Sequence, residues 1–494
     1  MSSSAISGPR VREVIHSDGS PGHVAPRVGA GGRLEVADWY PVNSPYDGRE
    51  IALVPSCTPS DIERASASAL AHLERGLVQR ERAQVLLRAA SLLSEAKESF
   101  ARIIALEAGK PIRASRAEVA RCVDTLTLSA AEALVLSGEV VPMDATSSGA
   151  GRLGFAIRVP IGVVGAITPF NFPLNLAAHK VAPAIAAGCP VVLKPAPATP
   201  LSALAFAELL GEAGLPDGWL SVVTGPGDEL GATLVSRSEV RLVSFTGSCE
   251  VGWKIAAAAP RKRVCLELGS NAPVIVEPDA DLCAVIPLIA AAAFGYSGQS
   301  CISVQRLLVH EDIAEALSSG IATQANQLVV GDPLDEHTDV GPVINAQSAD
   351  RIIRSIAAAQ DDGARILAGG EADGNLVRPT VLTTVREASE LWSQEAFSPV
   401  CVVMPYKSFD DAIRLANASD YGLHAGVFTN NLSTALQAAR RLEFGGVVVN
   451  DVPTLRVDQQ PYGGAKTSGN TREGPRYAIE EMTELRFVSF GPAQ

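Results

Sequence analysis

Two residues of this 494-residue chain have side chains and neighbours suited to covalent catalysis. Cys301 follows the small polar run Gly298-Gln299-Ser300, and Glu267 lies upstream between Leu266 and Leu268. A thiolate is a strong nucleophile and a carboxylate can activate water, so the pair could form and then hydrolyse a thioester. Each also has a structural interpretation, as a buried core cysteine and as a salt-bridged strand glutamate.

A third polar side chain, Asn171, lies in the rigid segment Thr168-Pro169-Phe170-Asn171-Phe172-Pro173. An amide framed by aromatic and proline residues can donate a hydrogen bond to a developing oxyanion. Asn171 can equally cap a helix that we expect to start near Leu174. The segment alone leaves both roles open.

Three predicted strand ends upstream of Glu267 carry residues suited to a nucleotide. Two are glycine-containing turns, 225–231 and 245–248, where the backbone can approach a ligand closely. The third holds Lys194, whose ammonium can reach ribose hydroxyls or phosphate. Each has an ordinary structural interpretation, as a tight turn or a solvated lysine. Ligands in open α/β sheets bind at the carboxyl ends of strands, so the three ends together predict a cofactor crevice.

Alternating strands and helices must position these residues. From residue 161 onward, short apolar runs alternate with helical stretches, which indicates βαβ units and parallel, doubly wound sheets. The predicted strands before Glu267 are 163–167, 191–193, 220–223 and 241–245. Those after it are 274–276, 307–309, 400–403 and 446–449. The sequence thus predicts an α/β fold with two doubly wound, Rossmann-like domains.

Helices and a hairpin are predicted before this alternation. The helices cover 59–75, 80–108 and 114–137, and the first has the residue order of a capping box with proline at its first position. Extended segments 138–142 and 154–160 flank a turn rich in serine and glycine. The last strand, 484–490, would leave an unpaired edge, so we expect it to pair with another subunit.

Composition excludes several classes of protein. The net charge of -13 argues against nucleic acid as a partner, because phosphate binding requires a basic face. The longest apolar stretch, 284–296, is too short to span a bilayer and predicts a buried helix, and no secretory signal is visible. The eight cysteines form no metal-binding or disulfide pattern, which favours a reducing cytoplasm and predicts no metal site.

Taken together, the motifs resemble those of the aldehyde dehydrogenase superfamily from about residue 44 to the C-terminus. They are Thr-Pro-Phe-Asn-Phe-Pro at 168–173, Lys-Pro-Ala at 194–196, Phe-Thr-Gly-Ser at 245–248, Leu-Glu-Leu-Gly at 266–269, Gly-Gln-x-Cys at 298–301, Glu-Ala-Phe-Ser-Pro at 395–399 and Pro-Tyr-Gly-Gly-Ala-Lys-Thr-Ser-Gly at 461–469. Their order along the chain also matches.

The resemblance implies a role for each matching residue. Cys301 would be the nucleophile, Glu267 the general base, and Asn171 with the Cys301 backbone amide the oxyanion hole. Implied cofactor contacts are Ile167, Thr168, Pro169, Phe170, Lys194, Pro197, Gly227, Gly231, Phe245, Thr246, Gly247, Ser248, Leu268, Glu395 and Phe397. Implied substrate contacts are Asn171, Leu174, Ser300, Ile302 and Arg456.

The resemblance also implies a division of the chain. Residues 1–33 would form a flexible arm, 34–137 with 161–266 the NAD(P)-binding domain, and 267–465 the catalytic domain. Residues 138–160 with 466–494 would form a small oligomerisation element of a homodimer or homotetramer.

Two features bear on cofactor and substrate. NAD-preferring relatives often carry an acid three residues after the lysine, but Pro197 occupies that position here, so NAD and NADP both remain candidates. Arg456, in the stretch that shapes the pocket mouth of such enzymes, predicts a small polar or anionic aldehyde, as in the lactaldehyde, succinate-semialdehyde and phosphonoaldehyde dehydrogenase branch. The alternative for Arg456 is a structural salt bridge.

The expected reaction is oxidation of the aldehyde to a carboxylic acid, with hydrolysis of a cysteine thioester. A coenzyme-A-acylating enzyme is the nearest alternative, but such members typically lack the glutamate found at 267. A noncatalytic binding protein on this scaffold would be expected to have lost Cys301, Glu267 or Asn171.

Overall fold

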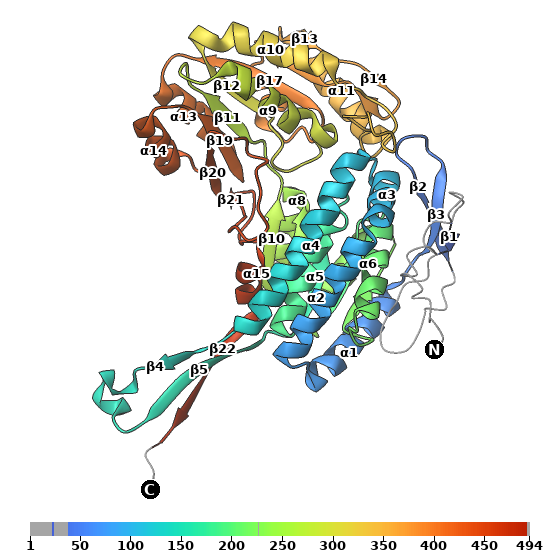
Figure 1. The fold of residues 1–494 in the computed structure, drawn as a ribbon, viewed down its shortest axis with the longest axis vertical. Helices are drawn as coiled ribbons and strands as arrows, with labels where there is room; N and C mark the ends of the chain where they lie inside the picture. The colour runs from blue at the N-terminus through green and yellow to red at the C-terminus, as the bar shows by residue number, and fades with distance from the viewer. Residues whose placement is uncertain (1–21, 24–37, 226, 492–494) are drawn as a thin grey trace, which may run out of the picture.

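The computed structural model describes residues 22–23, 38–225 and 227–491, which form two α/β domains and a projecting three-stranded sheet (Figure 1). The predicted arm, 1–33, lies outside the described residues except for β1 (Gly22–His23), which pairs in parallel with β3. Within the described ranges, no helix is long and apolar enough to cross a membrane.

The first domain is built on a five-stranded parallel sheet. In spatial order its strands are β10 (Arg263–Leu268), β9 (Val240–Gly247), β6 (Val163–Ile167), β7 (Val191–Lys194) and β8 (Leu220–Val222). Its crossover helices are α5 (Asn175–Ala187), α6 (Leu201–Glu212), α7 (Gly227–Ser236) and α8 (Cys249–Ala258). The chain runs outward from β6 to β8 and returns to β9 on the other side of β6. Strand order therefore reverses between β6 and β9, which is the usual place for a ligand crevice.

Four helices precede this sheet: α1 packs against β6, β7 and β8, while α2, α3 and α4 pack against α5 and α6 (Figure 1). They are α1 (Pro59–Arg75), α2 (Gln79–Glu95), α3 (Lys97–Ala108) and α4 (Ile112–Val135). The predicted capping box is present, since the Thr58 backbone N–H donates to the Asp61 carboxylate at 2.7 Å. The single helix predicted over 80–108 is wrong, because Ala96 leaves the helical conformation with ψ of 13° and separates α2 from α3.

The second domain contains a seven-stranded sheet that is parallel except for one edge strand, β13. In spatial order its strands are β13 (Arg365–Ala368), β16 (Thr380–Thr383), β17 (Val400–Tyr406), β12 (Arg306–His310), β11 (Pro273–Val276), β19 (His424–Phe428) and β20 (Gly446–Val449). Its helices are α9 (Leu282–Phe294), α10 (Ala314–Gln327), α11 (Ala346–Asp361), α12 (Glu390–Ser393), α13 (Phe409–Asn417) and α14 (Leu432–Arg441). The two doubly wound α/β domains of the sequence prediction are confirmed. Strands β10, β13, β16 and β19 of the two sheets were not among the predicted strands.

The predicted hairpin forms a separate sheet with the C-terminal strand and projects from the first domain (Figure 1). Its order is β22 (Thr483–Phe490), β5 (Leu153–Pro160) and β4 (Glu139–Val141). Strand β22 pairs antiparallel with β5 of its own chain over its full length. It is still an edge strand of this sheet, so its pairing with another subunit stays a prediction. Within 466–482, helix α15 (Pro475–Glu481) packs against α4 and α5 rather than on this sheet.

Smaller elements complete the described chain. They are β2 (Trp39–Asn43) with β3 (Glu50–Pro55), β14 (Ala372–Asp373) with β15 (Leu376–Val377), β18 (Tyr421–Gly422) with β21 (Ala465–Lys466), and the 3₁₀ turns η2 (Met143–Ala145), η3 (Ser147–Gly149), η4 (Gly295–Gly298) and η5 (Glu311–Ile313).

Candidate active site

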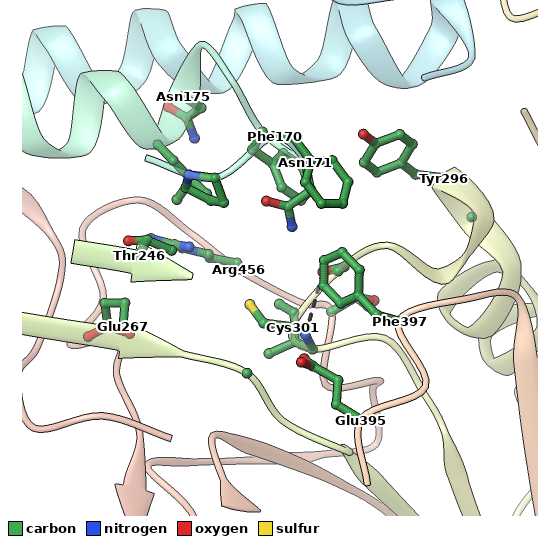
Figure 2. A pocket seen from close by; sticks show the side chains of 18 of the residues that line it. Phe170, Asn171, Asn175, Thr246, Glu267, Tyr296, Cys301, Glu395, Phe397 and Arg456 are labelled. Carbon is green, nitrogen blue, oxygen red and sulfur yellow. Dashed lines mark hydrogen bonds between the residues drawn. The ribbon is translucent and has the colours of Figure 1, made fainter. Parts of the chain in front are cut away.

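A cavity of about 670 Å³ opens between the two domains, and it contains the three residues predicted to do chemistry. Asn171 reaches it from the loop after β6, Glu267 from β10, and Cys301 from the loop between η4 and β12. In Figure 2 the three side chains surround one space, with the Asn171 amide directed toward Cys301. The fold therefore brings together residues that are up to 130 positions apart in sequence, as the gap from Asn171 to Cys301 shows.

The half-buried Cys301 thiol lies beside an aromatic hydroxyl. Its Sγ is 2.9 Å from the Tyr462 hydroxyl oxygen, within hydrogen-bonding distance. Burial raises the pKa of the Cys301 thiol to about 12, although Tyr462 and the charge of Arg456 act in the opposite direction. Cys301 is therefore a neutral thiol in this state. It must lose a proton before it can attack a carbonyl.

Glu267 is buried, and neither of its carboxyl oxygens accepts a hydrogen bond from any described residue. Burial raises its pKa well above the usual value, and the nearby carboxylate of Glu473 raises it further. The cations Arg456, Lys180 and Arg472 work against this rise. A buried carboxyl with no protein partner and a raised pKa is suited to exchange a proton with water or substrate.

Asn171 is also buried, and one N–H of its side-chain amide already donates a hydrogen bond. Its Nδ2 donates to the Gln299 carbonyl oxygen at 3.0 Å, which ties the amide to the segment that carries Cys301. Its Oδ1 accepts no hydrogen bond within the described part of the chain. The second N–H of the amide is thus available to a ligand in the cavity.

Several predicted cofactor residues line the same cavity. They are Pro169, Phe170, Thr246, Gly247, Ser248, Leu268, Glu395 and Phe397. Thr246 Oγ1 is buried without a partner among the described residues, and Ser248 caps the N-terminus of α8, where backbone N–H groups favour an anion.

Glu395 packs tightly against the backbone of the cavity wall. Its Oε1 accepts from the Ser270 backbone N–H at 2.8 Å, and a Cβ on Gly269 would lie 2.2 Å from its Oε2. Burial raises the pKa of Glu395 to about 7. Phe397, whose φ is +48°, meets the Phe170 ring edge-on at 5.7 Å between centroids. These residues form a polar and aromatic cradle that fits a nucleotide with a ring system.

Other predicted contacts lie outside the cavity wall, around the strand ends of the first sheet. They are Ile167, Thr168, Leu174, Lys194, Pro197, Gly227, Gly231 and Phe245. Lys194 is buried at the end of β7, and burial lowers the pKa of its ammonium. A Cβ on Gly227 or Gly231 would meet no atom within 4 Å, so the described residues leave open space beside both glycines.

Among the predicted substrate contacts, Ser300, Ile302 and Arg456 line the cavity. Both interpretations of Arg456 find support, because Nη2 donates to the Glu473 carboxylate at 2.8 Å while the guanidinium also faces the cavity. Its Nε has no partner among the described residues, and its guanidinium lies 3.7 Å from the centre of the Tyr462 ring. Arg456 is therefore a salt-bridged residue that retains one free donor.

Several residues of the cavity wall were missed by the sequence analysis, and four of them have polar side chains that are considered next. They are Lys110, Arg121, Tyr462 and Glu473. Arg121 donates twice to Asp458, at 2.7 and 3.2 Å, and Glu473 accepts from Lys180 at 3.3 Å. Tyr462 stood in a recognised motif and carried a signal. Lys110 lies between two helices, and Arg121 belongs to a helix that was expected only to pack.

Comparison with known proteins agrees with this geometry. Residues 35–488 match the model of the aldehyde dehydrogenase family. The chain is 46% identical over 453 residues to 3-sulfolactaldehyde dehydrogenase of Priestia megaterium, covering 92% of this chain and 95% of that protein.

Two solved structures have the same fold over nearly the whole chain. One is aldehyde dehydrogenase 21 of Physcomitrella patens in complex with the reaction product succinate, at 37% identity and a TM-score of 0.93, covering 96% of this chain and 99% of that one. The other is the glyceraldehyde-3-phosphate dehydrogenase GapN of Methanocaldococcus jannaschii complexed with NADP, at 39% identity and a TM-score of 0.89, covering 93% and 100%. The chain belongs to the aldehyde dehydrogenase family and is an NAD(P)-dependent oxidoreductase that acts on the aldehyde group.

Proposed function

We propose that Cys301 is the nucleophile, Glu267 the general base, and Asn171 with the Cys301 backbone amide the oxyanion hole. The observation that carries the proposal is that these three side chains meet in one cavity. Cys301 transfers its thiol proton to water and the resulting thiolate adds to the aldehyde carbon. The alkoxide of the thiohemiacetal then accepts hydrogen bonds from the two amides. The chemistry that NAD(P)⁺ supplies when bound is acceptance of a hydride from the thiohemiacetal carbon, which leaves a thioester on Cys301.

Glu267 then completes the reaction as a base. It removes a proton from a water molecule that attacks the thioester, and the Cys301 sulfur leaves as the carboxylic acid forms. The absence of any described partner on its carboxyl oxygens supports this role, since neither oxygen is engaged in a hydrogen bond within the described residues.

The cofactor would be held by the cradle described above. Ser248 and the N-terminus of α8 suit the pyrophosphate, Glu395 the nicotinamide ribose, and Phe397 the nicotinamide face. Lys194 at the end of β7 suits the adenosine ribose. With Pro197 near it and no acid three residues after the lysine, both NAD and NADP fit this site.

The substrate we propose is a small aldehyde with an anionic tail. Arg456 and Arg121 both line the cavity, and a guanidinium group donates well to a carboxylate, sulfonate or phosphate oxygen. The relatives support this class, because one is named for 3-sulfolactaldehyde and another was solved with succinate, both of which are anions at neutral pH.

We further propose that the protein is a cytoplasmic homodimer or homotetramer. The projecting sheet supports assembly, since β4 and β22 are both edge strands and carry Val140, Leu485 and Phe487 at 77, 53 and 54% exposure. A reducing compartment is supported by the eight cysteines, which are all free thiols.

A panel of paired anionic and neutral aldehydes, assayed with NAD and NADP by the absorbance of the reduced cofactor, tests the function. We expect turnover of anionic members with free acid as the product, and no turnover by Cys301→Ala. Dependence on coenzyme A with a thioester product would instead identify an acylating enzyme. No turnover with any aldehyde would indicate a noncatalytic protein.

A further inference from the structure

Lys110 and Glu118 form an ion pair that is shut off from solvent at the junction of α3 and α4. Their side chains are 1% and 0% exposed, and the Lys110 ammonium donates to Oε2 of Glu118. The desolvation of such a pair offsets most of its Coulomb attraction, so it contributes little to stability compared with apolar residues of the same size. Each of the two residues also contacts a segment that carries or adjoins a proposed catalytic residue.

Glu118 holds the residues that directly follow the loop containing Asn171. Its Oε1 accepts from the backbone N–H groups of Leu174 and Asn175, at 3.0 and 3.1 Å. These two groups lie at the start of α5, three and four residues after Asn171. A carboxylate on the first N–H groups of a helix fixes the position of that end of the helix, and hence of the loop before it.

Lys110 connects that loop to the segment that carries the nucleophile. Its ammonium lies 3.7 Å from the centre of the Phe172 ring and 4.3 Å from that of Tyr296. The two rings also meet edge-on, with centroids 6.0 Å apart. Phe172 is adjacent to Asn171, and Tyr296 begins the turn that leads to Cys301, so one buried cation contacts both catalytic segments.

The turn before Cys301 requires such support. Tyr296, Ser297 and Gly298 have φ values of 50°, 55° and 65°, a conformation that is strained for the two non-glycine residues. The Tyr296 hydroxyl donates to the Ala108 carbonyl at 3.2 Å, two residues before Lys110. The end of α3 therefore holds this strained turn by a hydrogen bond as well as by the cation.

We propose that Lys110 and Glu118 are positioning residues that hold the Asn171 loop and the Cys301 turn in register across the two domains. They keep the Asn171 amide directed at the oxygen that becomes the alkoxide, and they act through Asn171 rather than on the reacting atoms. This inference rests on the proposed function of Asn171 and Cys301, and it adds two residues that the motifs of the family did not indicate.

A double-mutant cycle tests the inference, with the rate of reduced-cofactor formation in the first turnover as the readout. Lys110→Met should lower that rate about 10-fold or more, and Asn171→Ala about 100-fold, because an oxyanion donor typically contributes 100- to 1,000-fold. The combined variant should be within about twofold of Asn171→Ala alone. A purely structural role for Lys110 would instead give losses that multiply.

Glu118→Gln, which retains an oxygen for the two backbone N–H groups but removes the charge, provides a second route if Lys110→Met does not fold. Glu107→Gln is the matched control, because Glu107 is equally buried and accepts from the Leu201 and Ser202 backbone N–H groups at 2.7 and 2.9 Å at the start of α6. It should lower thermal stability and leave the first-turnover rate unchanged. Lys110→Arg, which keeps the cation, should recover part of the rate lost in Lys110→Met.

Two results would overturn the inference. One is an unchanged first-turnover rate in both Lys110→Met and Glu118→Gln, and the other is a multiplicative loss in the cycle. Failure of the proposed function gives a different pattern, since Asn171→Ala or Cys301→Ala would then turn over like the unchanged enzyme.

Discussion

Glu267 and Glu473 are two buried carboxyl groups of one cavity whose pKa values are displaced in opposite directions. Burial and the charge of Glu473 raise the pKa of Glu267. For Glu473, burial is outweighed by Lys180, His179 and Arg456, which hold its pKa at about 2. Neighbouring carboxyls with divergent pKa values are typical of a site that assigns separate acid and base roles.

This relationship predicts how Glu473→Gln changes the pH dependence. Removing the charge of Glu473 removes a repulsion that raises the pKa of Glu267, and it also leaves Arg456 and Lys180 without their partner. Both effects lower the pKa of Glu267, so the base becomes active at lower pH. The acidic limb of the kcat profile should therefore move to lower pH. A limb that stays in place or moves to higher pH would show that Glu473 does not set this pKa.

Gly269→Ala should weaken cofactor binding selectively. The new Cβ would lie 2.2 Å from Glu395 Oε2, so the carboxyl must move away from the proposed nicotinamide ribose. We expect the KM for the cofactor to rise about 10-fold, the cost of one charged hydrogen bond, while alkylation of Cys301 by iodoacetamide keeps its rate. Gly331→Ala is the control, since its Cβ would be at an ordinary 3.5 Å from Thr338 Oγ1. Equal KM values for the two variants would contradict the placement of Glu395.

Arg121→Ala tests whether the enzyme prefers anionic substrates, and it leaves the ion pair between Arg456 and Glu473 intact. If Arg121 and Arg456 together attract the anionic tail, kcat/KM should fall about 10-fold for anionic aldehydes and by less than about twofold for neutral ones of similar size. Arg456→Ala should show the same selectivity, with an added loss of stability because Glu473 is left buried without its arginine. Equal effects on anionic and neutral aldehydes in both variants would make these arginines purely structural.

The sequence was sufficient to predict the elements and residues whose signal is local. The buried parallel strands were recognisable as continuous apolar runs. The neighbours of Cys301, Glu267 and Asn171 left a structural alternative open for each, and their roles came from the resemblance of all the motifs together. Lys110 and Arg121 gave no local signal, because their importance arises from contacts with residues distant in the sequence, Phe172 and Tyr296 for Lys110 and Asp458 for Arg121. The break at Ala96 was missed for a related reason, since apolar residues continue on both sides of it.

Arg456 shows a second limit of prediction from the sequence. Its sequence position allowed either an anion anchor or a salt bridge, and the fold combines the two by placing Glu473 on one donor and the cavity beside another. Which hydrogen-bond donors of Arg456 remain free depends on Glu473, which is 17 positions further along the chain, and on residues of β10 and α5. No local sequence pattern encodes such contacts.

The most direct test of the central claim is a single turnover of Glu267→Gln with aldehyde and cofactor, followed by mass spectrometry of the Cys301 peptide. We predict one equivalent of reduced cofactor per site, then a kcat lowered by about 100-fold or more, and an acyl group on Cys301. Hydroxylamine should release that group. Continued turnover at the rate of the unchanged enzyme, with no acylated Cys301, would contradict the account.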